Sequence, residues 1–354
     1  MSQIRLVIAD RDSMFLEKFS AYLIKSKTPS FSLELFSSDN KLAEWINKGE
    51  KADIIAISLT LYNDLIEKPD KKNLVLLRDC PESMVPEGLN SIFKYRPASI
   101  LMKELISLSA EQIPQDIERE TELSKINLVL YADGSDVLNP FAQSLALMKA
   151  SSGQKTFYMS LDEISNTDAY FSGNNIRGLS EMLYYVKSYK DNLSLKAEAC
   201  TTLDIKTGVY FMKSHYNLCD VANLTEAELS TLIMSVNNIS RYDEIIITRG
   251  FSNDTLLPVL IKASHKIYIT ALNYFTSVER IKIINSALTK FEEENNIILK
   301  DKVLFCLTDI IPGYSSEDLN TLNYNLRHFS SPIYGSSVSF PPNEKYFSEL
   351  KAIL

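Results

Sequence analysis

The sequence predicts an α/β protein of two doubly wound domains: a flavodoxin-like first domain and a second domain with a mostly parallel sheet. Apolar strand-like runs alternate with amphipathic helical segments along the chain. A length of 354 residues exceeds one ordinary domain. A polar, acidic stretch around Pro114 separates two such series. We therefore expect a first domain over 1–115, a linker over 116–125 and a second domain over 126–354.

The first domain is expected to contain five strand–helix units. Each strand is a short apolar run, and the helices carry apolar residues three and four positions apart. Strands are expected over 4–10, 31–36, 52–58, 73–78 and 91–95, and helices over 13–24, 39–45 and 98–107. A parallel sheet built in this series favours the strand order 2-1-3-4-5.

The second domain repeats the alternation of strands and helices. Strands are expected over 127–131, 156–160, 244–248, 266–270 and 302–307, and helices over 140–149, 178–189, 226–237 and 277–293. Strands separated by helices imply a mostly parallel sheet with both faces covered. An amphipathic final helix over 345–354 is expected to pack on this domain.

Composition excludes several classes of protein. The net charge of −8 gives no basic face for a nucleic-acid partner. No apolar run approaches the ~18–20 residues that span a bilayer, so no transmembrane segment is expected. The four cysteines form no CxxC pair and have no histidine at ligand spacing. We expect a cytoplasmic, reduced protein without a structural metal.

Residues 1–115 resemble the receiver domains of response regulators. Asp10 and Asp12 match the acids after the first strand of that family, and Lys94 matches its lysine after the fifth strand. Ser58 stands where the resemblance implies the phosphoryl-accepting aspartate. A serine hydroxyl cannot serve both as a metal ligand and as an acyl-phosphate former. We expect an atypical, unphosphorylated receiver in which Asp10 and Lys94 form an ion pair.

The segment that begins INLVLYADGSDVLNP resembles the opening of MinD/ParA-like P-loop ATPases, whose loop reads KGGVGKTT. Laid on that loop, Asp133 and Leu138 stand at its two lysines, and Asn139 stands at its magnesium-holding threonine. Asn139 is also a good helix N-cap. Further along, Thr248 stands where the resemblance implies the aspartate of the second nucleotide-binding strand. The sequence therefore predicts a degenerate P-loop.

These replacements predict a protein without catalytic residues. A P-loop works because backbone N–H groups and a lysine hold the phosphates, whereas Asp133 and Asp136 would repel them. We expect no enzyme activity, no metal site and no cofactor, so that the chain is a pseudoenzyme. ATP binding without hydrolysis stays open as the alternative, with Gly134, Ser135 and Asn139 as the cofactor-binding residues.

The order of the two domains resembles that of the TadZ/CpaE-like pilus-assembly proteins over nearly the whole chain. The resemblance implies a cytoplasmic homodimer at the cell pole, on the inner face of the membrane. Its implied partners are the proteins of the Tad pilus and secretion machinery. We therefore expect a non-catalytic localisation scaffold. The alternative is an ATP-binding but non-hydrolysing dimeric switch of the MinD/ParA type.

Overall fold

The computed structural model describes residues 4–25, 31–109, 124–188, 190, 192–239, 242–310, 319, 322–332 and 340–353. The chain divides into two compact units. The first comprises Met1–Glu122, Glu181–Cys200 and Leu232–Ser240, and the second comprises Leu123–Ser180, Thr201–Thr231 and Arg241–Leu354. The expected domain boundary near Pro114 and residues 116–123 of the expected linker lie outside the described residues.

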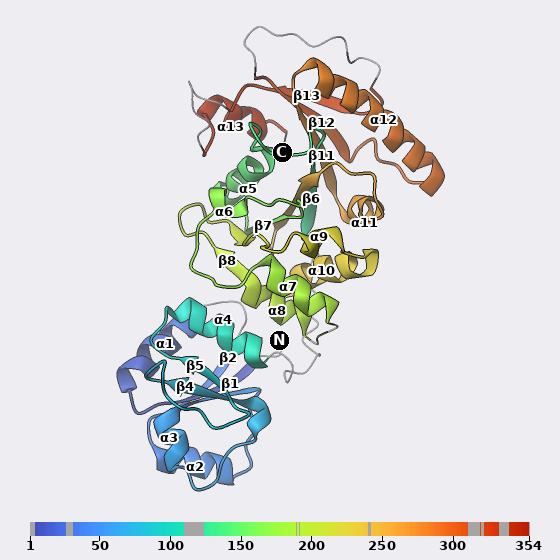
Figure 1. The fold of residues 1–354 in the computed structure, drawn as a ribbon. Helices are drawn as coiled ribbons and strands as arrows, with labels where there is room; N and C mark the ends of the chain where they lie inside the picture. Colours follow the sequence, from blue (N-terminus) through green and yellow to red (C-terminus); the bar gives the residue numbers. More distant parts are fainter. Residues whose placement is uncertain are drawn as a thin grey trace. The chain divides into compact units, whose positions relative to one another are not determined.

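The first unit contains a five-stranded sheet in the order β2-β1-β3-β4-β5 (Figure 1). All four neighbouring pairs of strands are parallel, so the predicted order is confirmed. The strands are β1 (Ile4–Ala9), β2 (Phe31–Phe36), β3 (Ile54–Ser58), β4 (Leu74–Arg78) and β5 (Asn90–Phe93). The helices between and after them are α1 (Ser13–Lys25), α2 (Asp39–Asn47), α3 (Leu59–Asp64), the 3-10 turn η1 (Lys71–Asn73) and α4 (Ala98–Ser109).

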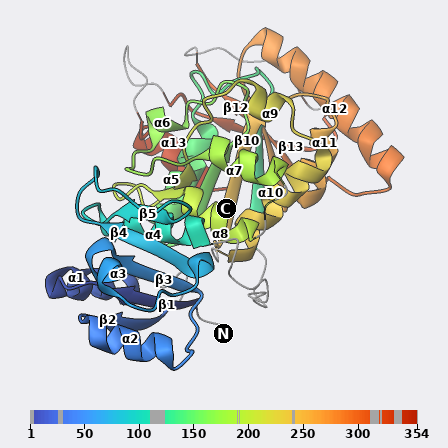
Figure 2. The same cartoon turned by 60° about the horizontal axis from the view of Figure 1, so that its bottom comes forward.

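Helices cover both faces of this sheet (Figure 1 and Figure 2). Side chains alternate along β1, so that Leu6 and Ile8 enter the core formed with α1 and α4. Val7 and Ala9 enter the core formed with α2 and α3. Trp45, the only tryptophan of the chain, is buried in this second core. The near-continuous apolar run of β1 is therefore explained by burial on both faces.

The second unit contains an eight-stranded sheet in the order β13-β12-β11-β6-β10-β7-β9-β8. Every neighbouring pair is parallel except β8 and β9. The strands are β6 (Lys125–Tyr131), β7 (Thr156–Ser160), β8 (Thr201–Leu203), β9 (Tyr210–Met212), β10 (Glu244–Gly250), β11 (Lys266–Leu272), β12 (Val303–Thr308) and β13 (Asn325–Phe329). The five predicted strands are present, and β8, β9 and β13 were not predicted.

The remaining helices follow the strands in sequence. They are α5 (Phe141–Ser151), α6 (Thr167–Tyr170), α7 (Leu179–Lys187), α8 (Leu193–Cys200), α9 (Cys219–Ala222), α10 (Glu226–Ile239), α11 (Leu256–Ala263), α12 (Phe275–Asn295) and α13 (Glu344–Lys351). In Figure 1, α5 and α13 lie on one face of the large sheet, and α11 and α12 lie on the other. The final helix α13 buries Tyr346 and Leu350, which confirms its predicted packing.

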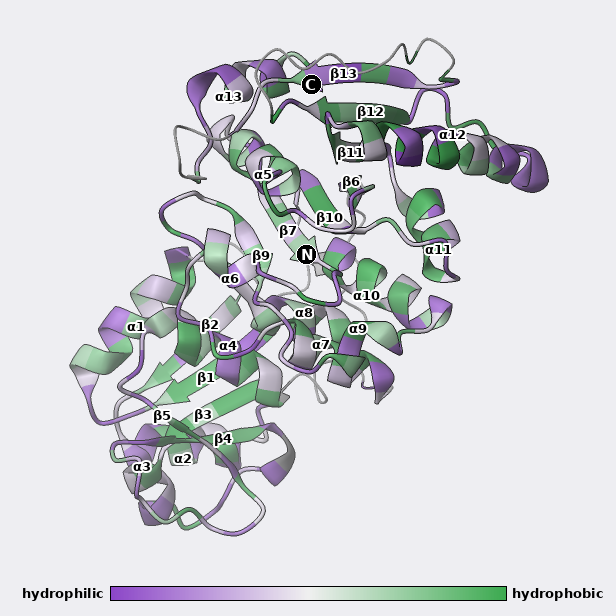
Figure 3. Cartoon of the chain, turned by 45° about the horizontal axis from the view of Figure 1, so that its top comes forward, coloured by the Kyte–Doolittle hydropathy of each residue, from purple (hydrophilic) through white to green (hydrophobic). Residues whose placement is uncertain are grey.

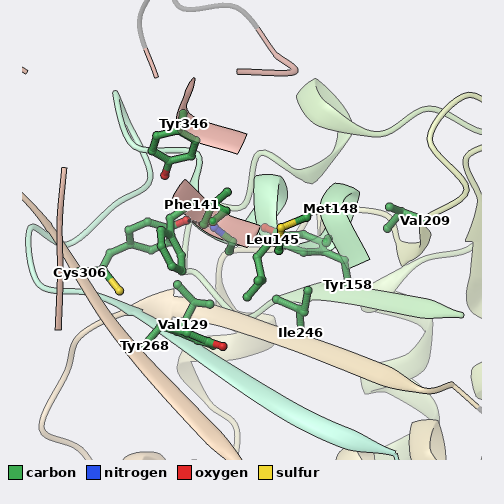
Figure 4. Close-up of a cluster of buried hydrophobic side chains, with 14 of the residues drawn as sticks. Val129, Phe141, Leu145, Met148, Tyr158, Val209, Ile246, Tyr268, Cys306 and Tyr346 are labelled. Carbon is green, nitrogen blue, oxygen red and sulfur yellow. Dashed lines mark hydrogen bonds between the residues drawn. The ribbon is translucent and has the colours of Figure 1, made fainter. Parts of the chain in front are cut away.

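The core of the second unit lies between α5 and the central strands. Figure 4 shows Phe141 and Met148 of α5 above Val129 of β6 and Ile246 of β10. All four side chains are fully buried. This packing fixes α5 on the sheet, and with it the loop that joins β6 to α5.

Hydropathy follows the same layers. Figure 3 shows β1, β3 and β12 coloured as hydrophobic, whereas β13 is hydrophilic over part of its length. The mixed character of β13 fits its place at the edge of the sheet, where three of its five residues are exposed. In the described ranges, no helix combines the length and the apolar character needed to cross a bilayer.

Candidate functional site

Polar side chains gather at one edge of the large sheet. Because β6, β7, β10, β11 and β12 are parallel, their carboxyl ends meet at this edge. Crevices at this edge of parallel α/β sheets are where ligands bind. Residues 132–140, which we call the β6–α5 loop, lie here between β6 and the start of α5.

Two glycines bring this loop against the end of β10. Gly134 has a φ of +90°, which disfavours residues with a side chain. A Cβ atom at Gly250 would lie 2.6 Å from the carbonyl oxygen of Gly134. Position 250 therefore accepts only glycine while the loop keeps this place.

Asp133 ties the loop to the junction between β11 and α12. Its carboxylate accepts a hydrogen bond from the Leu272 N–H at 2.8 Å and one from the Ser277 hydroxyl at 2.7 Å. The Arg280 guanidinium lies 3.7 Å from the same carboxylate. The charge of Asp133 is therefore compensated inside the protein.

Asp136 points into the protein. It is 6% exposed and accepts hydrogen bonds from the Gln143 side-chain amide at 2.7 Å and the Asn166 side-chain amide at 3.0 Å. Gln143 also donates to the Tyr158 hydroxyl at 3.0 Å. Burial, and then the charge of Asp136, raise the pKa of Tyr170. The expected repulsion of phosphate is thus weakened at Asp133, which the Arg280 guanidinium approaches, whereas the donors to Asp136 are neutral amides that orient its carboxylate and leave its charge in place.

Asn139 does not cap α5. The residue before the helix is Pro140, and no side chain caps it. The Asn139 amide instead donates to the Thr270 hydroxyl at 2.8 Å and accepts from the Thr308 hydroxyl at 3.2 Å. Asn139 is 2% exposed, so it anchors the end of the loop to β11 and β12.

The backbone in the middle of the loop is unbonded. The N–H groups of Ser135, Asp136, Val137 and Leu138 have no hydrogen-bond acceptor among the described residues. Ser135 is exposed, as are the side chains of Val137 and Leu138. Consecutive N–H groups of this kind, beside the start of a helix, are the donors that hold anions.

Asp162 joins the end of β7 to the end of β10. Its carboxylate accepts from the Gly250 N–H at 2.6 Å and from the Ser160 hydroxyl at 2.8 Å. Burial raises the pKa of Asp162 above its usual range, although both hydrogen bonds act in the opposite direction. Arg249 is paired through two hydrogen bonds with Asp254, at 2.6 and 3.2 Å. Neither charge is left without a partner.

Thr248 carries a fully buried hydroxyl with no hydrogen-bond partner among the described residues. Replacing it with valine should raise the free energy of unfolding by about 1 kcal/mol, because the cost of burying an unpaired hydroxyl disappears. Urea unfolding measures the change. Thr248→Ser is the control, since it keeps the hydroxyl, loses a methyl group and should be destabilising. A Thr248→Val protein less stable than wild type would contradict the unpaired hydroxyl.

Three residues that hydrogen-bond to the β6–α5 loop were not singled out from the sequence: Gln143, Thr270 and Thr308. Gln143 is a polar residue near the start of the largely apolar α5, Thr270 interrupts the apolar run of β11, and Thr308 ends the apolar run of β12. Polar residues at such places could have been singled out as candidates. The Asn139–Thr308 bond spans 169 residues, so its pairing needed the folded structure.

A second polar cluster lies at the carboxyl edge of the first sheet. The Lys94 ammonium lies 2.8 Å from Asp10 and 2.5 Å from Asp79, which confirms the predicted Asp10–Lys94 ion pair. Burial lowers the pKa of Lys94, but hydrogen bonds to Asp10 and Asp79 outweigh it and raise the pKa above its ordinary value. Ser58 is fully buried, and its hydroxyl accepts from the Leu61 N–H at the start of α3. That hydroxyl is therefore already engaged.

Comparisons with known proteins report on the fold. No family model matches the chain, and no curated protein matches it. A chain of the MinC:MinD cell division protein complex of Aquifex aeolicus is similar with a TM-score of 0.50 and 11% identity, over 65% of this chain and 95% of that chain. This similarity confirms the predicted MinD-like α/β fold with a mostly parallel sheet, and it concerns the fold alone.

Two further solved structures are similar at lower scores. A putative plasmid partition protein of Borrelia burgdorferi bound to AMPPNP gives a TM-score of 0.49 at 16% identity, over 66% of this chain and 97% of that one. A ParA family ATPase of Chlorobium tepidum gives 0.46 at 15% identity, over 58% and 82%. The prediction that the chain is not an enzyme is contradicted, because the similar structures include ATPases. The replacements at Asp133, Leu138, Asn139 and Thr248 did not suffice to exclude that class.

A magnesium–triphosphate fits the β6–α5 loop in part. The backbone supplies unbonded N–H groups beside the start of α5, as phosphate binding requires. The side chains differ from a P-loop, because Leu138 brings no charge and Thr248 brings no carboxylate. No three His, Cys, Asp or Glu side chains in the described ranges are grouped to hold a metal. The unbonded N–H groups support phosphate binding by the backbone of this loop.

Proposed function

We propose that this chain is a dimeric nucleotide-binding switch of the MinD/ParA type, with the β6–α5 loop as the element that meets the phosphates. The observation that carries the proposal is the run of four unbonded N–H groups from Ser135 to Leu138. They lie at the carboxyl edge of the sheet, where ligands bind in folds of this class. Among the proposed cofactor-binding residues, Ser135 offers an unbonded N–H to the phosphates, Gly134 shapes the loop while its own N–H donates to the Tyr131 carbonyl, and Asn139 fixes the loop.

Arg280 supplies positive charge at this loop. Its guanidinium approaches the Ala132 carbonyl oxygen at 3.4 Å, and its side chain is 55% exposed. It therefore keeps donors that face solvent. A guanidinium matches the geometry of phosphate oxygens. The other arginine at this edge, Arg249, is engaged with Asp254.

Calorimetry and sedimentation test the switch together. We expect ATP with Mg²⁺ to bind with a Kd on the order of 10 µM and to shift the protein from monomer to dimer. Arg280→Met should weaken ATP binding about 10-fold, the factor for losing a charged hydrogen bond. Lys290→Met, at a 74% exposed position of the same helix, should leave it unchanged. A protein that binds no ATP and stays monomeric at all concentrations contradicts the proposal.

We further propose that the switch positions pilus and secretion machinery at a cell pole, as the TadZ/CpaE-like resemblance implies. The support is the order of the two halves in the sequence, together with the 2-1-3-4-5 sheet of the first unit. A fluorescent fusion in the native host should form polar foci, and secretion proteins should co-purify with it. Diffuse fluorescence and a preparation without secretion proteins would reject this finer role and leave the dimeric switch untouched.

A further inference from the structure

Asp133, the second residue of the β6–α5 loop, is held more firmly than the middle of the loop. The Asp133 carboxylate takes hydrogen bonds from Leu272 and Ser277, and Arg280 approaches it at 3.7 Å. All three partners belong to the end of β11 or the first turns of α12. One side chain therefore connects the loop to a helix that begins more than 140 residues later in the sequence.

The Asp133 carboxylate lies near the N-terminus of α12, where a negative charge is favourable. A carboxylate near a helix N-terminus is stabilised by the helix dipole and by the unpaired N–H groups of the first turn. The residue before α12, Tyr274, provides no side-chain cap. Asp133 accepts from the Ser277 hydroxyl, so its carboxylate lies beside the first turn of α12.

The other flank of the loop is held independently. The Gly134 carbonyl lies against Gly250, whose N–H donates to Asp162 at 2.6 Å. The Gly134 N–H donates to the Tyr131 carbonyl, and the Asn139 N–H to the Asp136 carbonyl. The loop therefore has contacts on both sides that require no bound phosphate.

We propose that Asp133 is a positioning residue that keeps the β6–α5 loop formed in the absence of nucleotide and couples it to the first turn of α12. The inference rests on the proposed function, because it assigns the regulation of the same loop. It reverses the role that charge alone suggests for Asp133. A repelling carboxylate would weaken nucleotide binding, whereas a positioning carboxylate pre-organises the loop and strengthens it.

Two substitutions of equal charge separate these roles. Asp133→Asn removes the negative charge and keeps an oxygen acceptor for the Leu272 N–H. Asp133→Ala removes both the charge and the acceptor. If Asp133 positions the loop, ATP should bind about 10-fold more weakly to Asp133→Ala than to Asp133→Asn. If Asp133 only repels phosphate, the two variants should bind ATP equally, and both more tightly than wild type.

Hydrogen exchange at single amides tests the loop without nucleotide. In Asp133→Ala we expect the Gly134 and Asn139 amides to exchange about 10- to 100-fold faster, along with the Val278 amide in the first turns of α12. Asp133→Asn should stay close to wild type. Asp301→Ala, at an exposed position of the same unit, is the matched control. Exchange in the core of β6 and β10 should not change, which separates a local loss from general unfolding.

The result that overturns the inference is a wild-type loop whose Gly134 and Asn139 amides exchange freely until ATP is added. Unchanged exchange of these amides in Asp133→Ala would overturn it as well. A protein that binds no ATP and never dimerises contradicts the switch and leaves the exchange result to decide this inference. The two proposals therefore fail on different measurements.

Discussion

Replacing Lys94 with methionine should lower the free energy of unfolding of the first unit by about 3–5 kcal/mol. The side chains of Lys94 and Asp10 are each 3% exposed, and their charged atoms lie 2.8 Å apart. Methionine fills the space of the lysine stem and leaves the Asp10 carboxylate buried without its cation. Urea unfolding followed by fluorescence measures the loss, because the only tryptophan, Trp45, lies in the core of this unit.

Two variants control this experiment. Lys18→Met, at an exposed position of α1, should change the stability by less than about 0.5 kcal/mol. Asp10→Asn introduced together with Lys94→Met should restore part of the lost stability, because a neutral amide costs less to bury than a carboxylate. Equal unfolding midpoints for Lys94→Met and wild type would show that the Asp10 carboxylate is solvated, against the geometry described here.

Replacing Lys149 with methionine should destabilise the second unit by a similar amount, about 3–5 kcal/mol. Lys149 of α5 lies 2.8 Å from Glu244 at the start of β10, with side-chain exposures of 11% and 3%. Asn127 donates to the same carboxylate at 2.6 Å, but it is neutral and cannot compensate the charge. Exchange of the slowest amides in β6 and β10 reports the free energy of unfolding of this unit.

Two variants control this measurement. Glu244→Gln in the Lys149→Met background should recover part of the lost stability, whereas Lys290→Met on the exposed face of α12 should leave the stability unchanged.

Glu244 and Gly250 stand at opposite ends of β10, roughly 20 Å apart at ~3.3 Å per residue. Lys149→Met should therefore lower stability without changing ATP affinity at temperatures where the protein stays folded. A specific loss of ATP affinity in the folded variant would show that the two ends of the strand are coupled.

The sequence was sufficient for the elements buried on both faces. Strands such as β1, β3 and β10 are apolar runs bounded by polar residues, and their predicted bounds agree with the structure to within about two residues. Burial on both faces produces this signal, because no solvent-facing position interrupts the run. The predicted order of the first sheet followed from the same alternation of strands and helices.

The elements that were missed have weak or ambiguous local signals. β8 and β9 are three residues long, too short for a periodicity to appear. β13 exposes polar residues because it lies at an edge. α11 contains Pro258, which indicates a break in a helix; here it stands in the first turn, where the backbone N–H has no partner to lose.

The sequence places the candidate site in the loop after β6, which stays a prediction, and residue types alone did not describe the contacts of that loop. The sequence identifies Asp133 and Asp136 as negative charges in a phosphate loop. It does not reveal that Ser277, Gln143 and other distant donors hold these carboxylates. Compensation of a charge depends on tertiary contacts, so the residue type at position 133 predicted repulsion where the fold places the Arg280 guanidinium 3.7 Å from the carboxylate.

The close approach of Gly134 and Gly250 makes residue 250 an indicator of loop position that can be followed through related sequences. The carbonyl oxygen of Gly134 occupies the space that any Cβ at position 250 would need. A homologue with alanine or a larger residue at position 250 must have a β6–α5 loop of different backbone conformation. Aligned homologues could thus be sorted by this single position into those that retain the present loop and those that have rebuilt it.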